Sequence, residues 1–424
     1  MVTISRTRPV TLAAVSPAVA PPKPPPAFLQ ALGIGAFRRL LASNGLAFMG
    51  KYIQNIIVAW LVLEMTDSNF WVGIVNGVPA LSIVLFSLFG GVLADRMDRR
   101  TLLMWSRVSL ASLSFLSAFL IAAGIIELWH LVAIVMLVMG LHAIDEAVGR
   151  TLAGMIVGKE RLLSANSMTT LVRNLGTVVG PAVIGVLMAR YGPSAGLYLM
   201  AGTYLTAFLT LFLIQSQGAG EQKKQIRVLG DLVDGFKYVR RNSCLTWLIG
   251  LAFTVPLAGV YFAMLPVYAR EVLLVGSEGL GLLVGIYSLG GLLGSLFLTL
   301  RSNVGHKGWL VLGSGLTYVA GMLVVAFSHS FALSLLATFI VGVAAMLWIN
   351  TMTTLVQSQA INEMQGRVMS LFGLGLQLHA LGWLIGGMLG IVFGYQGAMV
   401  IAGAVFVGVH LFAFAWSQQL RHID

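Results

Sequence analysis

Long apolar runs separated by short polar segments make up most of the chain. Each run is about 20 residues long, the length that crosses the hydrocarbon core of a bilayer, so the pattern predicts twelve spanning helices. The first six are expected at residues 40–63, 70–93, 101–123, 129–150, 166–190 and 195–214. The second six are expected near residues 244–269, 278–300, 308–328, 331–350, 367–392 and 397–416.

Two other segments interrupt this pattern. Residues 1–27 are rich in proline, which predicts a disordered tail. Residues 216–242 are polar and basic, but Leu229, Leu232 and Phe236 recur at helical spacing. This linker is expected to form an amphipathic helix on the cytoplasmic membrane surface. It divides an N-terminal six-helix bundle, residues 40–215, from a C-terminal one, residues 243–417. The predicted fold class is an all-α polytopic membrane protein with twelve transmembrane helices in two halves.

Composition and charge support a membrane protein. The chain of 424 residues is 58% hydrophobic and 10% charged, whereas soluble proteins are about 25% charged. Its net charge of +11 does not indicate nucleic-acid binding, because the basic residues cluster in alternate loops. If Arg38 and Arg39 are cytoplasmic, only Arg190 and Arg270 lie on the other side, and Lys51 lies within a span. The positive-inside rule then predicts a multi-pass protein of the plasma (inner) membrane with both termini in the cytoplasm.

Several kinds of catalytic site are missing from the sequence. It contains no G-x-x-x-x-G-K-[ST], H-E-x-x-H, G-x-S-x-G or C-x-x-C motif. Its single cysteine, Cys244, excludes an internal disulfide and a multi-cysteine metal site. We therefore expect no enzymatic activity, no cofactor, no metal site and no nucleic-acid partner.

The short loop at residues 91–100 reads G-V-L-A-D-R-M-D-R-R and turns the chain at the basic face. It resembles the loop between helices 2 and 3 of the major facilitator superfamily, G-x-L-A-D-R-x-G-R-K, with Asp98 in place of the glycine. The resemblance implies that Asp95 faces a helix N-terminus of the other half, where the helix dipole favours an anion. It also implies that Arg99 and Arg100 stay on the cytosolic surface. The alternative is an ordinary basic turn.

A second motif, residues 357–370, narrows the resemblance. Together with residues 60–66 and 162–166, it is similar to the enterobactin-exporter branch of that superfamily, also called transmembrane secretion effectors. The similarity spans nearly the whole chain outside the N-terminal tail. Glu363 is expected to favour the N-terminus of helix 11, which Asp95 would face. The residues of this expected conformational latch are Gly91, Asp95, Arg96, Arg99, Arg100, Glu363, Gly366 and Arg367.

The predicted fifth helix carries a row of small residues that resembles the antiporter signature of the superfamily. These residues are Gly176, Gly180, Pro181 and Gly185. Small residues four apart let helix backbones approach closely, and proline adds a bend. The signature implies efflux, and the alternative is tight packing alone. Gly382 and Gly386 of the eleventh helix echo Gly176 and Gly180, which favours a duplication of the two halves.

Polar residues inside the spans are candidates for function, because their burial in lipid is costly. Asp145 and Glu146 are candidates for uptake of the driving proton. The branch often has an aspartate here followed by a proline and an arginine, and this chain has Arg150 one place later. In the alternative interpretation, a carboxylate pairs with Arg150 or Arg173 near the headgroups.

Lys51 lies eleven residues beyond Leu40, about 16 Å deep at the helical rise of 1.5 Å per residue. We expect it to face a polar cavity or an anion, and predict a pair with Asp145 when the substrate site is empty. A static structural pair and direct capture of an anionic substrate are alternatives. The full set of proton or substrate candidates is Lys51, Asn55, Asp145, Glu146, Arg150, Gln377 and His379, although lone histidines are more often packed.

These features together predict a secondary active transporter that works by alternating access, with the two halves rocking around a midplane site. We expect proton-coupled efflux of a small, partly apolar molecule such as a siderophore, drug or metabolite. The expected partners are this substrate, protons and the lipid bilayer, and the expected oligomeric state is a monomer. Transport of a lipid or lysolipid and a non-transporting membrane sensor remain alternatives.

Overall fold

The structure, a computed structural model, describes residues 27–77, 82, 86, 97–158, 161–214, 228–301 and 305–421. Within these residues every regular element is helical. The first half contains η1 (Ala27–Gly33), α1 (Gly35–Thr66), α2 (Asn69–Gly77), α4 (Arg99–Ala122), α5 (Leu128–Val157) and α6 (Leu162–Phe212). The linker helix is α7 (Val228–Arg241). The second half contains α8 (Ser243–Ala252), α9 (Val255–Val267), η3 (Tyr268–Val272), α10 (Gly276–Leu300), α11 (Lys307–Phe327), α12 (Phe331–Gln359), α13 (Asn362–Gln377), η4 (Leu378–Ala380), α14 (Leu381–Trp416) and α15 (Gln418–Arg421).

The described residues form nine helical stretches that are long and apolar enough to cross a membrane. Two of these stretches, 164–212 and 363–416, each cover two predicted spans. The predicted second helix begins as α2, and its remainder lies outside the described residues except for single positions. Eleven predicted spans and the start of the second thus lie in helices of the described residues, and the predicted fold class is confirmed.

The two long stretches each turn at one glycine. Gly192 has φ 78° and ψ 174° inside α6, and Gly394 has φ 68° and ψ 176° inside α14. Glycine adopts this left-handed conformation without the steric cost that other residues meet. Pro193, which cannot donate a backbone hydrogen bond, follows the first turn. Each turn falls between the two spans predicted from the sequence.

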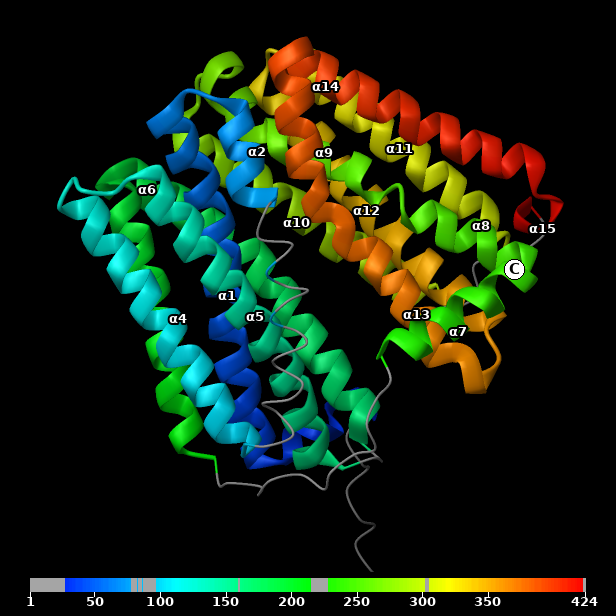
Figure 1. Ribbon diagram of the computed structural model, residues 1–424, viewed down its shortest axis with the longest axis horizontal. Coiled ribbons are helices and arrows are strands. Elements are labelled where there is room, and N and C mark those ends of the chain that lie inside the picture. Colours follow the sequence, from blue (N-terminus) through cyan, green and yellow to red (C-terminus); the bar gives the residue numbers. More distant parts are fainter. Residues whose placement is uncertain are drawn as a thin grey trace, which may run out of the picture.

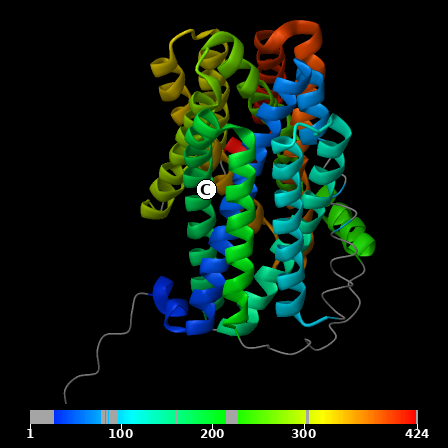
Figure 2. The ribbon, with the colours of Figure 1, turned by 90° about the vertical axis from the view of Figure 1, so that its left-hand side faces the viewer.

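The helices form two groups that meet at one end and diverge toward the other (Figure 1). Figure 2 shows the first half from its own side, where α1 runs along α6. The diverging end of the first half is the N-terminal end of α1 and α4, which carries Arg38, Arg39, Arg99 and Arg100. We call it the basic end and call the opposite end, where the halves meet, the contact end.

Glycines bring the halves together at the contact end. A Cβ atom on Gly73 of α2 would lie 3.0 Å from the Cα atom of Gly387 in α14. A Cβ atom on Gly185 of α6 would lie 2.8 Å from the Cα atom of Gly281 in α10. The two crossings therefore put backbone against backbone with no side chain between them.

An ion pair joins the halves beside these glycines. The Arg270 guanidinium of η3 lies 2.7 Å from the Asp67 carboxylate, which follows α1. It also donates a hydrogen bond of 2.9 Å to the carbonyl of Leu63 in the last turn of α1. A basic side chain at a helix C-terminus is favoured by the helix dipole.

The two crossings repeat between the halves. Gly185 and Gly387 are 202 residues apart, and so are the turn glycines Gly192 and Gly394. The predicted fifth span, in α6, thus corresponds to the predicted eleventh span, in α14. The repeat expected from Gly176 and Gly382 differs from this alignment by four residues, about one helical turn.

The start of α4 differs from the sequence-based expectation. Asp98 accepts hydrogen bonds from the backbone nitrogen and hydroxyl of Thr101, at 3.0 and 2.9 Å, and so caps the helix N-terminus. Arg99 was expected on the surface, but it is buried and donates to the Met155 sulfur. Arg100 donates to the last carbonyls of α6, at Leu211 and Phe212.

The predicted amphipathic helix of the linker is present as α7. Gly235 and Val239 turn toward the second half, where α7 lies against α13 (Figure 1). Val233 and Phe236 are exposed on the other side. The Asp234 carboxylate pairs with Arg367 of α13 at 3.4 Å, which ties the linker helix to the second half. Residues 1–26 of the expected disordered tail and residues 216–227 of the linker lie outside the described residues, while Ala27 begins η1.

Candidate functional site

A buried charge network holds the four helices α1, α4, α5 and α6 together. Arg107 of α4 is fully buried, and its Nε atom donates to the Asp145 carboxylate of α5 at 3.1 Å. Its other nitrogens donate to Asn44 of α1 at 2.6 Å and to the Ser43 hydroxyl. Ser106 donates a further bond of 2.8 Å to Asp145. Buried charges are tolerated only when paired and hydrogen-bonded, and both conditions are met here.

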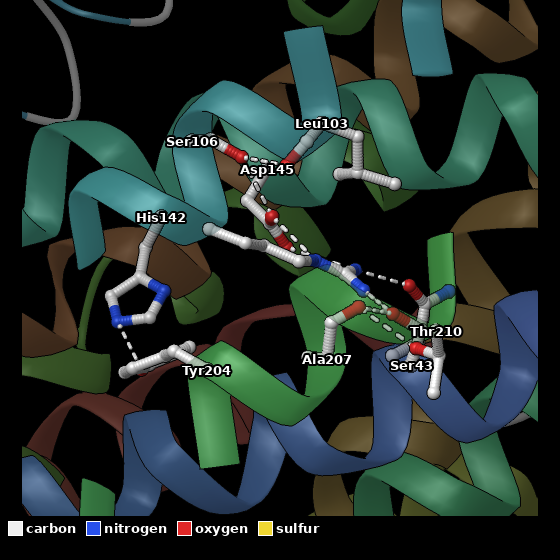
Figure 3. Close-up of polar contacts among 10 residues, drawn as sticks. Ser43, Leu103, Ser106, His142, Asp145, Tyr204, Ala207 and Thr210 are labelled. Atoms are coloured by element: carbon white, nitrogen blue, oxygen red, sulfur yellow. Dashed lines mark hydrogen bonds and ion pairs between the residues drawn. The ribbon is translucent and has the colours of Figure 1, made fainter. Parts of the chain in front are cut away.

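Figure 3 shows how the sixth helix joins this network. The Ser43 hydroxyl donates to the backbone carbonyl of Ala207 in α6. About one turn away, the Tyr204 hydroxyl lies 3.0 Å from the Nε2 atom of His142 in α5. These bonds satisfy the polar groups next to Arg107, so the Arg107–Asp145 pair is part of a connected hydrogen-bond network.

The neighbouring carboxylate, Glu146, has a different environment. Three cations surround it: Lys51 at 3.5 Å, Arg173 at 3.6 Å and Arg150 at 3.8 Å. The predicted pair of Lys51 with Asp145 is therefore wrong in this structure, because Lys51 binds Glu146 and Asp145 binds Arg107. The alternative interpretation, a carboxylate paired with Arg150 or Arg173, describes Glu146.

Glu146, Arg150 and Arg173 line a cavity of about 260 Å³ between α1, α5 and α6. Its walls are formed by Asn44, Phe48, Asp145, Glu146, Gly149, Arg150, Asn166, Thr169, Thr170 and Arg173. Glu146 precedes the end of α5 by eleven residues, and Arg173 follows the start of α6 by eleven. At 1.5 Å per residue both lie about 16 Å from the ends of their helices, well inside the bundle.

The row of small residues in α6 serves two contacts. Gly176 and Gly180 face α1, where added Cβ atoms would meet backbone atoms of Met49 at 3.3 and 3.2 Å. Gly185 faces α10 of the other half, as described above, and the Pro181 carbonyl lies beside Gly281. The first two glycines thus place α6 directly against the stretch of α1 that carries Lys51.

The expected latch is only partly described. Gly91, Asp95 and Arg96 lie outside the described residues. Glu363 and Gly366 are exposed in the first turns of α13, and Arg367 pairs with Asp234 of the linker helix. Arg99 and Arg100 contact other helices of the first half. Because the loop side of the latch lies outside the described residues, the latch stays a prediction.

The remaining polar candidates lie apart from the Glu146 cavity. Asn55 is half-buried on α1, one turn beyond Lys51, and Gln377 is exposed at the end of α13. His379 in η4 packs edge-on against Phe262, with ring centroids 5.4 Å apart.

His410 of α14 is held at both ring nitrogens. Its Nε2 atom accepts from Trp348 at 3.1 Å, and its Nδ1 atom is 2.8 Å from the Phe406 carbonyl. Since one nitrogen accepts and the other faces an acceptor, the ring fits one neutral tautomer. This histidine is packed and satisfied.

Sequence reasoning did not single out Arg107, Ser43 or Asn44. One signal could have found the arginine, because it lies six residues inside the predicted span that begins at Thr101. That is about 9 Å from the end of the span, too deep for a side chain that simply follows the positive-inside rule.

Comparisons of the sequence and the fold with known proteins show which family the chain belongs to. The family described as "Transmembrane secretion effector" matches residues 27–423. The multidrug efflux pump Tap of Mycolicibacterium fortuitum is 26% identical over 369 residues, which cover 80% of this chain and 85% of the pump. The staphyloferrin A transporter of Staphylococcus aureus is 24% identical over 393 residues, which cover 90% of this chain and 96% of the transporter.

Among solved structures, a mutant of the nucleoside transporter NupG superposes with a TM-score of 0.75 at 11% identity. The match covers 90% of this chain and 99% of NupG, so the two share a fold. The chain belongs to the transmembrane secretion effector family of the major facilitator superfamily, and it is a multi-pass membrane transporter rather than an enzyme.

Proposed function

We propose that the protein exports a small, partly apolar molecule in a proton-coupled cycle, and that Glu146 carries the driving proton. One observation carries the proposal: Glu146 is a carboxylate about 16 Å from the end of its helix that lines a cavity. Its ion pairs are long, 3.5–3.8 Å, and its side chain is 27% exposed. A proton can therefore reach it without dismantling the fold. Asp145 instead holds Arg107 in place through shorter bonds.

The relatives support export as the direction. The similar proteins named above are a multidrug efflux pump and a transporter of staphyloferrin A. The glycine row of α6, which resembles the antiporter signature, agrees with efflux. Both halves needed for alternating access are in one chain, so we propose that a monomer is the transport unit.

The charge distribution supports an orientation. We infer that the basic end faces the cytoplasm, which follows the positive-inside rule and leaves both termini there. The halves meet at the contact end, so this conformation would admit substrate from the cytoplasm. Rocking of the halves would then open the contact end. In that second conformation, Asp95 would reach the helix start that carries Glu363, Gly366 and Arg367.

The test begins with untargeted comparison of metabolites in the medium. Cells that express the protein are compared with cells that express Glu146→Gln and with cells that lack the gene. We expect at least one compound to be exported by the protein and not by Glu146→Gln. Glu64→Gln is the matched control, because Glu64 is an exposed carboxylate near the contact end of α1.

The exported compound is then added to everted membrane vesicles that hold a fluorescence-reported pH gradient. We expect it to dissipate the gradient through the wild type but not through Glu146→Gln. Export by Glu146→Gln at the wild-type rate would contradict the role of Glu146, and export without any change in the gradient would contradict proton coupling. A lysolipid among the exported compounds would favour the lipid alternative.

A further inference from the structure

The cluster around Glu146 carries more positive than negative charge. Lys51, Arg150 and Arg173 share this one carboxylate, and the adjacent Asp145 is engaged by Arg107. We propose that the cavity binds the anionic group of the substrate, and that the exported molecule is therefore a soluble organic anion such as a carboxylate. This inference rests on the proposed function only where it names the exported molecule. Binding of the anion to the cavity does not require export.

The depth of the cluster favours the binding of an anion. Surplus positive charge near the bilayer centre costs at least about 2.5 kcal/mol per residue unless it faces water or a counter-charge. The positive-inside rule accounts for basic residues near the headgroups, but Lys51 and Arg173 lie about 16 Å or more inside their helices. An arriving carboxylate would balance part of this charge.

The arginines are able to bind such a group. Arg150 and Arg173 have 67% and 39% of their side chains exposed. Their distances to Glu146 exceed the 2.7–2.9 Å of a strong charge-assisted hydrogen bond. The planar guanidinium group therefore keeps donors for a second, bidentate partner. Both side chains line the same cavity, so one anion can contact the two.

The rest of the cavity indicates what part of a ligand it holds. Hydroxyl and amide groups of Thr169, Thr170 and Asn166 line it together with the ring of Phe48. Its volume of about 260 Å³ lies just below the 300–1,000 Å³ of sites that enclose a drug-sized molecule. The cavity therefore fits an anionic head, and the body of the molecule would extend beyond it.

The second half of the transporter is suited to contact the uncharged part of the substrate. Its charged residues, among them Arg270, Glu278, Lys307 and Glu363, lie at or near the ends of their helices. Ionic selectivity would then come from the first half alone. The halves would divide recognition, with the anion bound by one and the apolar body contacted by the other.

The test uses three probes of one shape in isothermal titration calorimetry with purified full-length protein. The probes are 2-naphthoate, neutral 2-naphthamide and cationic 2-naphthylmethylamine, each corrected for binding to empty micelles. We expect naphthoate to bind at least tenfold more tightly than the amide, because charged hydrogen bonds contribute about 1.5–3 kcal/mol. The cation should bind least. Equal binding of acid and amide, or no binding of naphthoate at millimolar concentration, would overturn the proposal.

Variants locate the binding to the cluster. Arg173→Gln should weaken naphthoate binding about tenfold while leaving the amide unchanged. Arg190→Gln is the matched control, since it changes the same residue type at the other end of the same predicted span, next to the turn at Gly192 and outside the cavity. If Arg173→Gln does not fold, Arg150→Gln provides the same test. Naphthoate binding that no cluster variant weakens would refute the site.

Glu146→Gln separates this inference from the proposed function. The variant should lose export, yet bind naphthoate more tightly than the wild type, because the anion no longer shares the cations with a carboxylate. If Glu146→Gln binds naphthoate more tightly but exports normally, the anion site is supported and Glu146 is rejected as the proton carrier. Weaker binding would reject the anion site. Displacement of naphthoate by lysophosphatidylglycerol at lower concentration than by naphthoic acid analogues would overturn the assignment to a soluble anion.

Discussion

Gly185 of α6 and Gly281 of α10 cross with their backbones in contact, although they belong to different halves of the transporter. A Cβ atom on Gly185 would lie 2.8 Å from the Gly281 Cα atom and 3.1 Å from the Ser277 carbonyl oxygen. Because the obstructing atoms are backbone, a side chain here cannot be accommodated by a change of rotamer. The crossing therefore controls whether the contact end can close.

Gly185→Leu should disfavour the closed contact end. Overpacking of a tight contact costs about 1–3 kcal/mol, which shifts a two-state equilibrium about fivefold or more. Spin labels on Glu64 and Glu271, one in each half, report the separation at that end. We expect a longer distance in Gly185→Leu. Gly202→Leu is the control, because nothing lies within 4 Å of a Cβ atom at Gly202. An unchanged distance in Gly185→Leu would show that the crossing does not control closure.

The Asp67–Arg270 pair should depend on salt. The Asp67 side chain is 77% exposed, so its ion pair contributes at most about 1 kcal/mol and is screened at high ionic strength. The bond from Arg270 to the Leu63 carbonyl is less sensitive to salt. We expect Asp67→Asn to lower the melting temperature only at low salt, and Arg270→Gln to lower it at both low and high salt. Identical behaviour of the two variants would mean that the carbonyl bond contributes nothing.

The buried Arg107–Asp145 pair should show strong coupling. Removing one partner of a buried pair costs about 3–5 kcal/mol, whereas replacing both by apolar residues is often nearly neutral. We therefore expect Arg107→Met combined with Asp145→Leu to be more stable than either single variant, measured by unfolding in mixed micelles. Arg190→Met, an exposed arginine, should change stability by less than about 0.5 kcal/mol. If the losses of stability in the two single variants add up to the loss in the double variant, the coupling is refuted.

Cysteine labelling tests the orientation. In a Cys244→Ser background, a cysteine at exposed Ser330 should react with an impermeant thiol reagent in intact cells, because Ser330 begins α12 at the end opposite the basic loops. A cysteine at exposed Glu363, on α13, should react only after permeabilisation. The reverse pattern would place the basic end outside and invert the proposed direction of access.

The number and position of the spans could be predicted because the membrane constrains each one separately. A spanning helix satisfies its own backbone hydrogen bonds and needs about 20 apolar residues, so its pattern is local in sequence. The turns at Gly192 and Gly394 fell between predicted spans for the same reason. The assignment of the family rested on loop and helix-end motifs, which are also local.

The ion pairs could not be predicted in the same way. Counting residues from a helix end gives the depth of a side chain but not the direction in which it points. Asp145 and Glu146 have nearly the same depth, yet successive residues of a helix point about 100° apart. One therefore meets Arg107 and the other Lys51. The burial of Arg99 was not predicted for the same reason, because the direction of its side chain, toward Met155 of α5, cannot be read from the sequence.

The two glycine crossings have a consequence for the speed of the transport cycle. A joint formed by side chains must fix their rotamers each time it closes, which costs up to about 2 kcal/mol per long side chain. Gly73, Gly185, Gly281 and Gly387 have no rotamers to fix. The two crossings can thus separate and rejoin repeatedly with no side-chain entropy lost, which leaves Arg270 as a long side chain that is ordered at each closure.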